Sequence, residues 1–149
     1  MGQQQPAIRW ALGPADVAGA LAVREEVFCG EQGVPVEEEV DDRDEQALHL
    51  VALAPGTDHQ QVVGTLRLLL DGDRVKVGRV AVLRDWRGRG VAARMLELAL
   101  ARARAEGATE ARLASQLAVV PLYEQAGFTV QSGVFQDAGI DHVWMGREL

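Results

Sequence analysis

The sequence predicts an α/β domain built around a mixed β-sheet, and three observations lead to this prediction. Runs of strand-forming residues alternate with stretches of helical periodicity along the 149 residues. The turn Asp71-Gly72-Asp73 joins two of these runs as a hairpin. The alanine-rich residues 88–106 form the best helix candidate. No internal repeat or linker interrupts the pattern, so we expect a single domain, residues 1–149.

The first third of the chain is expected to hold a strand, a helix and an acidic loop. Residues 7–12 are the candidate strand. Gly13-Pro14 then indicates a helix start, because proline is tolerated in the first helical turn. The helix should end near residues 30–33, and the acidic residues crowded into 34–45 are typical of a loop.

The middle of the chain is expected to supply the centre of the sheet. Residues 47–54 and 61–70 are rich in strand-type residues, and residues 75–83 return as the next strand after the hairpin turn. The helix at 88–106 follows. Gly107 is well placed to end that helix, because glycine readily adopts a left-handed conformation after a last helical turn.

The last part of the chain should complete the sheet. Residues 109–115 form a candidate buried strand, and 117–125 form a short helix that Gly127 caps. Residues 128–135 and 142–149 are expected to pair as closing strands. The predicted order is therefore β-α-β-β-β-α-β-α-β-β.

Composition and charge exclude several classes of function. Hydrophobic residues make up 48% of the chain, as in ordinary globular proteins. The net charge of −7 argues against sequence-independent nucleic-acid binding. A lone cysteine, Cys29, indicates a reducing compartment. The first six residues lack the features of a signal peptide, and no apolar run is long enough to span a membrane, so we expect a soluble cytoplasmic protein.

The most informative local feature is the loop Arg87-Gly88-Arg89-Gly90-Val91-Ala92, which lies between a strand and the long helix. Unpaired N–H groups in a first helical turn, together with the helix dipole, favour anions. Glycine lets the backbone approach a ligand closely. We therefore expect this loop to hold a phosphorylated cofactor, although Arg87 and Arg89 as plain surface charges remain the alternative.

Two other phosphate-binding motifs fit this loop less well. Gly88, Gly90 and Ala93 satisfy the dinucleotide fingerprint, and Glu110 lies twenty residues beyond Gly90. A dinucleotide-binding glycine follows its strand almost at once, whereas residues 84–87 intervene here, and too few residues follow to complete a doubly wound domain. A P-loop is excluded because no Gly-Lys-Ser/Thr follows the glycines.

Two motifs together resemble those of the GCN5-related N-acetyltransferase (GNAT) family. Arg87-Gly88-Arg89-Gly90-Val91-Ala92 matches the family's R/Q-x-x-G-x-G/A motif after the strand Val80-Ala81-Val82. About 35 residues later, Leu122-Tyr123-Glu124-Gln125-Ala126-Gly127-Phe128 matches its Y-x-x-x-G-F segment. The segment at residues 27–35 and the ending at 137–145 are also similar to the small bacterial ElaA-like branch of that family.

The resemblance implies a fold, a reaction and a set of site residues. The sheet would be mostly antiparallel, splayed at a central strand and flanked by helices. Acetyl-CoA would be the co-substrate, with no metal, and a neutral primary amine would attack its thioester directly. Tyr123 would be the general acid. The implied acetyl-CoA-binding residues are Val80, Ala81, Val82, Arg87, Gly88, Arg89, Gly90, Val91 and Ala92.

The general base stays open at this level. An ammonium group must lose a proton before it attacks. Glu31, Asp41, Asp44, His49 and His142 are all candidates, and His49 also lies in an apolar strand pattern that suits a buried structural histidine.

Two further roles also stay open. Cys29 as an acyl-accepting nucleophile would need a positioned histidine, which the sequence does not place. Tyr123, the only tyrosine of the sequence, is either the general acid or a buried core residue whose hydroxyl is already hydrogen-bonded.

The acceptor side offers weaker signals. Arg67 and Arg79 should lie nearly opposite each other across the hairpin, and opposed like charges need an anion between them. That anion is either a carboxylate of the acidic loop or an acidic group of the acceptor. The candidate acceptor-binding residues are Glu31, His49, Arg67 and Arg79. The acidic loop would either attract a cationic acceptor or simply be solvated.

Partners and alternative functions complete the expectations. The acceptor is a small-molecule or protein amine, with neither nucleic acid nor membrane as a partner. Members of the family often dimerise through terminal strands, so a homodimer and a monomer are both open. A non-catalytic acyl-CoA-binding or interaction module is the alternative function.

Overall fold

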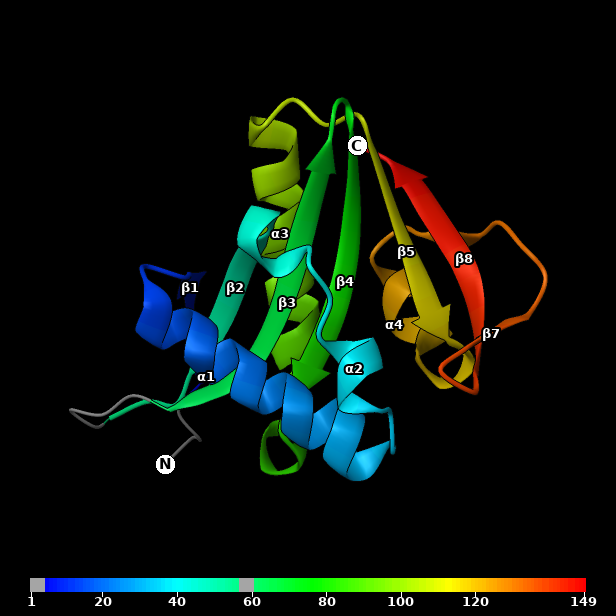
Figure 1. Cartoon of the computed structure of the whole chain (residues 1–149). Helices are drawn as coiled ribbons and strands as arrows, with labels where there is room; N and C mark the ends of the chain where they lie inside the picture. The colour runs from blue at the N-terminus through cyan, green and yellow to red at the C-terminus, as the bar shows by residue number, and fades with distance from the viewer. Residues whose placement is uncertain (1–4, 57–60) are drawn as a thin grey trace.

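The computed structural model describes residues 5–56 and 61–149. Over these residues, helices cover both faces of one twisted sheet (Figure 1). The strands are β1 (Ala7–Trp10), β2 (Leu48–Leu53), β3 (Val62–Asp71), β4 (Arg74–Val82), β5 (Glu110–Gln116), β6 (Thr129–Val130), β7 (Phe135–Asp137) and β8 (Ile140–Glu148). The α-helices are α1 (Pro14–Arg24), α2 (Val36–Glu39), α3 (Val91–Ala105) and α4 (Val120–Gln125). Shorter helical segments are the π-helix η1 (Glu25–Glu31) and the 3₁₀ turns η2 (Asp44–Gln46), η3 (Arg84–Trp86) and η4 (Leu117–Val119).

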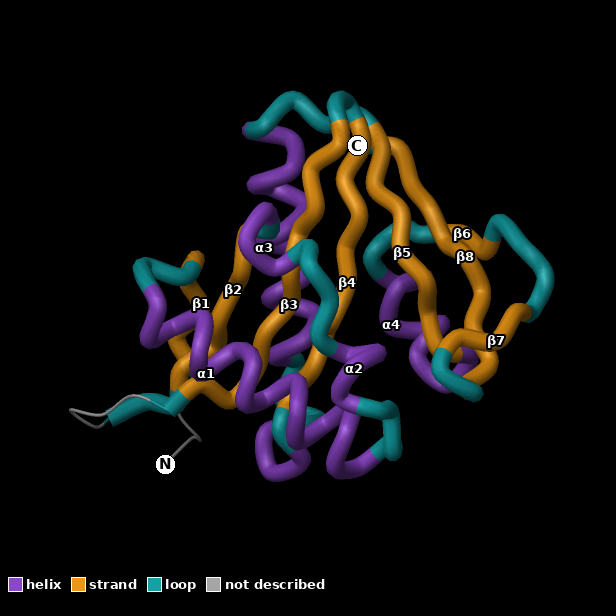
Figure 2. Tube along the Cα trace, viewed as in Figure 1, coloured by secondary structure: helices purple, strands orange, loops and turns teal. Residues whose placement is uncertain are grey.

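The sheet is mostly antiparallel and splits at its centre, as the sequence predicts. Its strand order is β1-β2-β3-β4-β5-β8-β6, and β7 also pairs with β8. Among the strands of the described residues, only β4 and β5 are parallel neighbours, and α3 provides the long crossover that such a pair needs. They pair at Arg74–Lys76 with Glu110–Arg112 and then separate, as Figure 2 shows. The separation opens a wedge between two halves of the sheet.

Two apolar cores lie on opposite faces of the sheet because strand side chains alternate between faces. In β2, Leu50 and Ala52 point towards α3, while Val51 and Leu53 point towards α1. The core on the α3 face is the larger, and it includes Met95, Leu96 and Ala99 of that helix. This packing fixes the helices on which the candidate site depends.

The predicted turn and helix stops are confirmed. Asp71 pairs with Arg74 across a two-residue turn, in which Gly72 has a φ of 61°. Gly107 and Gly127, which each follow the C-cap residue of α3 or α4, have φ values of 89° and 90°. The next amides, of Ala108 and Phe128, donate back to carbonyls of the preceding helices, as in Schellman caps.

The predicted end of the first helix is confirmed, because α1 continues directly into η1, which ends at Glu31. Two other predicted segments are wrong. The acidic stretch contains α2 and η2 rather than only loop, because ion pairs described below hold it against the sheet. Residues 128–135 do not form one strand, since β6 ends before Ser132-Gly133 and β7 starts after it.

The long helix also starts later than the predicted residue 88. Gly88 and Gly90 both adopt left-handed φ values, which end the preceding turn and leave Val91 as the first helical residue. None of the helices described here combines the length and apolar character that a membrane crossing needs.

Candidate active site

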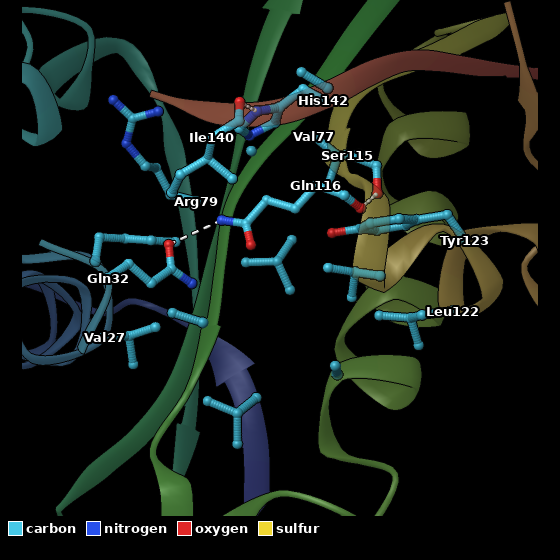
Figure 3. Close-up of a pocket in the computed structure, with 18 of the residues that line it drawn as sticks. Val27, Gln32, Val77, Arg79, Ser115, Gln116, Leu122, Tyr123, Ile140 and His142 are labelled. Atoms are coloured by element: carbon cyan, nitrogen blue, oxygen red, sulfur yellow. Dashed lines mark hydrogen bonds between the residues drawn. The ribbon is translucent and has the colours of Figure 1, made fainter. Parts of the chain in front are cut away.

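A pocket of about 520 Å³ fills the wedge between β4 and β5. Its walls come from segments far apart in the sequence: the end of η1, β4, the start of α3, the end of β5, α4 and the start of β8. Figure 3 shows side chains from these elements converging on one space. The fold therefore builds a site where the sheet is interrupted.

Strand β4 presents an unpaired edge to this pocket. Val80, Ala81 and Val82 line it, and beyond Lys76 the strand has no ladder partner in β5. A β-bulge lies here, because Arg79 and Val80 together oppose the single residue Leu66 of β3. Arg79 has a φ of 51°, which is unusual for a residue other than glycine. The free strand edge can pair with an extended, amide-bearing ligand.

The loop before α3 forms an anion site at one end of the pocket. Gly90 caps the helix in a left-handed conformation, with no side-chain cap and no acidic residue in the first turn. Arg94 is the first helical residue whose N–H finds a carbonyl, that of Gly90. The amides of residues 91–93 therefore lack helical acceptors, and these residues line the pocket. An ideal Cβ at Gly88 or Gly90 would meet nothing within 4 Å, so space lies in front of the loop.

The two arginines of this loop differ in their contacts. Arg87 donates through Nε to the Val82 carbonyl at 2.8 Å and through both terminal nitrogens to Glu31, at 2.9 and 2.8 Å. The Arg87 hydrogen bond lowers the pKa of Glu31. Arg89 stacks over the Trp86 ring at 4.6 Å and does not line the pocket. Arg87 is thus already paired, whereas no carboxylate of the described chain neutralises Arg89.

Tyr123 reaches into the pocket from α4. Its side chain is 7% exposed and packs edge-on against Phe128 at a centroid distance of 6.1 Å. Burial raises the pKa of the phenol to about 12, so the hydroxyl is protonated at neutral pH. Within the described residues, no hydrogen bond occupies that hydroxyl, and it is free to donate into the pocket (Figure 3). The residue therefore belongs both to the apolar core and to the pocket lining.

The pocket is also lined by polar residues that sequence reasoning did not select. The Gln116 amide at the end of β5 donates to the Gln32 side chain at 2.8 Å, across the wedge. Ser115 and Ile140 lie beside it. Gln32 and Gln116 are 84 residues apart, so no local pattern joins them. The sequence held one indication that Ser115 and Gln116 could reach a site, which is that they lie at the end of a predicted buried strand.

A buried ionic network holds residues 34–45, the acidic segment, against the sheet. Arg24, 1% exposed, pairs with Glu39 at 2.5 Å and with Asp44 at 2.8 Å. Arg67, 4% exposed, pairs with Asp41 at 2.7 Å and with Asp44 at 2.9 Å. Each buried charge has at least one opposite partner, which limits the cost of burial.

The network lowers the pKa values of two carboxyl groups. Hydrogen bonds from Arg67 hold the pKa of Asp41 well below its usual range. Burial alone would raise the pKa of Asp44, but hydrogen bonds from Arg24 and Arg67 outweigh it and lower the pKa. Both groups are therefore ionised near neutral pH.

Arg79 connects this network to the pocket. It pairs with Glu39 at 3.4 Å and with Asp41 at 3.3 Å, and it donates to the Glu39 carbonyl. Unlike Arg67, Arg79 also lines the pocket. The anion near these two arginines thus comes from the acidic segment, which was the first of the two predicted alternatives.

The structure brings most of the predicted residues together. Residues lining the pocket include Tyr123, Arg79 and every predicted acetyl-CoA-binding residue except Arg89. Glu31, His49 and Arg67 lie outside its lining. The His49 Nε2 lies 2.9 Å from the Asp44 carbonyl, beneath the acidic segment.

Cys29 also lies outside the pocket lining. Burial and the nearby acidic residues raise the pKa of its thiol, away from the reactive thiolate.

An antiparallel sheet that splits at one parallel pair, with a glycine-capped helix start and a buried tyrosine in the split, defines an acyl-CoA N-acyltransferase fold. The solved structure of an acyl-CoA N-acyltransferase from Pseudomonas aeruginosa shares this fold, with a TM-score of 0.80 and 29% identity, covering 95% of this chain and 99% of that one. The chain belongs to the acetyltransferase (GNAT) family, whose domain model matches residues 18–149.

Two further relatives agree with this assignment. "Uncharacterized N-acetyltransferase YjcF" of Bacillus subtilis is 37% identical over 131 residues, which cover 87% of this chain and 90% of the relative. The crystal structure of Escherichia coli ElaA superposes with a TM-score of 0.81 at 25% identity, covering 95% of this chain and all of that one (100%). The predicted resemblance to the ElaA-like branch is confirmed.

Proposed function

We propose that this protein is an acetyl-CoA-dependent N-acetyltransferase that acts on a primary amine. The observation that carries the proposal is the joining of three features in one pocket: a helix start with free amides, an unpaired strand edge and a protonated tyrosine. Acetyl-CoA would supply an activated acyl group as a thioester. Each feature meets a different chemical need of that substrate.

The amides of residues 91–93 and the Gly88–Gly90 backbone would bind the diphosphate. Free N–H groups and the positive end of the helix dipole favour its negative charge. The left-handed glycines leave the space that phosphate oxygens need. Arg89 would add positive charge from its stacked position on Trp86.

The free edge of β4 would bind the pantetheine arm by backbone pairing, as an added strand does. A backbone N–H in the range 80–82 would then face the thioester oxygen. Such a donor stabilises the oxyanion that forms when an amine attacks.

Tyr123 would protonate the departing thiolate. Transfer from a phenol of pKa about 12 to a thiolate, whose conjugate acid has a pKa near 8.5, is unfavourable by roughly three to four powers of ten. We infer that tyrosinate does not accumulate, because the attacking nitrogen gives up a proton in the same step and restores the phenol. Attack is direct, since Cys29 lies outside the pocket lining.

The acceptor is an amine of a small molecule or of a protein. The end of the pocket that would receive the acceptor is lined by two acidic residues, Glu38 and Asp137, and by two basic residues, Lys76 and Arg79. The acidic segment contributes less net field than its composition suggests, because Glu39, Asp41 and Asp44 are paired with arginines.

The test is turnover of acetyl-CoA with a panel of primary amines, followed by release of free thiol. The panel contains a polyamine, an amino acid, an amino sugar and a lysine peptide. Tyr123→Phe removes one oxygen, so we expect kcat to fall 10²- to 10⁴-fold while the Kd for CoA stays within about twofold.

Two results would count against the proposal. CoA binding without turnover for any amine would favour a non-catalytic acyl-CoA-binding module. An unchanged kcat in Tyr123→Phe would be compatible with acetyl transfer but would show that Tyr123 is not the general acid.

A further inference from the structure

The proposed reaction needs a group that removes a proton from the acceptor. A primary amine has a pKa near 10 and arrives mostly as ammonium, which has no lone pair for attack. This requirement rests on the proposed function. The acceptor end of the pocket therefore needs a base with an accessible lone pair.

Most carboxylates near the pocket are poorly suited to this task. Glu31 is engaged by Arg87, outside the pocket lining. Asp41 and Asp44 are held by buried arginines, and their lowered pKa values make them weak bases. Glu39 lines the pocket but is buried against Arg24. The carboxylates left are Glu38 and Asp137, both exposed at the rim.

His142 differs from these groups in position. It is 9% exposed, lines the pocket near the start of β8, and is the cross-strand partner of Gln116. Figure 3 shows it beside Ile140, close to Ser115. The imidazole stacks on Phe135 with centroids 5.9 Å apart, which restricts its rotation.

The hydrogen bond of His142 sets its tautomer. Nδ1 lies 2.7 Å from the Ile140 carbonyl oxygen, and a carbonyl oxygen only accepts, so Nδ1 carries a proton. In the neutral ring Nε2 then holds the lone pair. Nε2 bonds to no other residue in the described parts of the chain, and it does not count among their buried unpartnered atoms. It is therefore accessible.

We propose that His142 is the general base of this site. Nε2 takes a proton from the acceptor ammonium, directly or through one water, and the ring becomes imidazolium. The freed amine adds to the thioester carbonyl and forms the C–N bond, and collapse of the resulting oxyanion breaks the C–S bond. The second amine proton returns to Tyr123, which has protonated the thiolate, and His142 releases its proton to solvent. One proton leaves per acetyl group transferred.

Other charged groups face this position and must be separated from it experimentally. They come from β4, β7 and α2 and comprise Lys76, Arg79, Asp137, Glu38 and Glu39. The rim carboxylates are the competing bases, so their amide variants belong in the same experiment.

The test compares wild type with His142→Gln, His142→Asn and His142→Ala, using whichever primary amine of the panel the wild type acetylates. Asn can keep the donor to the Ile140 carbonyl, and Gln keeps polar volume near Nε2, but neither is basic. We expect kcat to fall at least 10²-fold in each variant, with CoA affinity within twofold of wild type.

Chemical rescue distinguishes a base from a structural role. Added imidazole and methylimidazoles should restore part of the His142→Ala rate, in order of their basicity. His49→Gln is the matched control, since it removes a buried histidine outside the pocket and should not lower kcat 10²-fold.

The outcomes separate the inference from the proposed function. Failure of the wild type to acetylate any amine overturns both. Turnover that survives in His142→Gln, or an Ala variant that no imidazole rescues, overturns the inference alone. A 10²-fold loss in Asp137→Asn or Glu38→Gln, with His142→Gln near wild type, assigns the base to the rim instead.

Discussion

The two ends of the pocket are built from different parts of the chain. At the end near α3, the functional groups are backbone amides and glycines within one short loop and one strand edge. At the acceptor end, side chains arrive from η1, β4, β5 and β8 and meet only in the fold. The first end needs a particular backbone conformation. The second needs the elements around it to be held in place.

The ionic network supplies part of that support. Three arginines and three carboxylates join α1, the acidic segment, β3 and β4, and the charges balance. The acidic segment is therefore fixed by paired charges, while apolar contacts fix α3. We expect perturbations of charge to act on the acceptor end and perturbations of backbone to act on the cofactor end.

Arg24→Met should give the largest effect on stability. Removal of this guanidinium breaks two buried ion pairs and leaves the buried Glu39 with only the longer contact to Arg79, and breaking a buried pair costs about 3–5 kcal/mol. Denaturant titration should show that loss in the free energy of unfolding. The folded fraction should bind CoA within twofold of wild type, because the glycine loop is untouched.

Arg74→Met is the matched control for this experiment. Its contact to Glu110 is 3.7 Å long and both side chains are exposed, so the expected loss is below about 1 kcal/mol. Equal losses in the two variants would remove the distinction between the network and ordinary surface pairs.

Gly90→Ala tests the other end of the pocket. Its φ of 76° costs a residue with a Cβ about 1–2 kcal/mol, and relaxation of that strain would turn the Val91 amide away from its ligand. We expect CoA affinity to fall at least tenfold by calorimetry. Gly72→Ala shares a positive φ and an open Cβ position but lies in the remote hairpin. It should lose similar stability and keep CoA affinity, and a loss of affinity in both variants would contradict a local role.

This contrast also explains what the sequence predicts well. The glycine loop, the β4 edge and the Tyr123 segment are contiguous, so each is recognisable from a few adjacent residues. The hairpin and the helix stops are equally local, because left-handed glycines determine them. These features predicted the fold class correctly, and they selected residues that, apart from Arg89, line one pocket in the fold.

The acceptor end was harder to predict because its contacts are long-range. The pairing of Gln32 with Gln116 spans 84 residues. The charge pattern of residues 34–45 does not indicate which carboxylates turn inward, since that depends on Arg24, Arg67 and Arg79 in other elements. Sequence reasoning therefore left five candidate bases, and only the pocket separates His142 from the rest.

Acid should weaken the network more than the rest of the fold. Asp41 and Asp44 have lowered pKa values when folded, so their contribution to stability is complete above the unfolded value of about 3.9 and declines as the pH falls through the folded values. We expect the unfolding free energy to drop below about pH 4. The drop should be shallower in Asp41→Asn.

Asp42→Asn is the control for this pH series, because it removes a neighbouring exposed carboxylate for which the described residues provide no ion pair. A slope altered as much in this variant as in Asp41→Asn would mean that general charge, rather than the paired network, sets the acid response.

Glu31→Gln should give the smallest effect and sharpens the role of Arg87. Glu31 is ionised and lies beside the loop that would bind a diphosphate, so its charge opposes that ligand. The amide variant removes the charge and frees one N–H donor of Arg87, because glutamine keeps a single oxygen acceptor, while the bond from Nε to the Val82 carbonyl still holds the guanidinium in place. CoA affinity should rise about two- to fivefold at low salt and less at high salt. Glu106→Gln breaks a comparable exposed pair with Arg102 at the far end of α3 and should change nothing. Weaker binding in Glu31→Gln would instead identify the pair as a brace that the loop needs, and would make side chains as important as backbone at this end of the pocket.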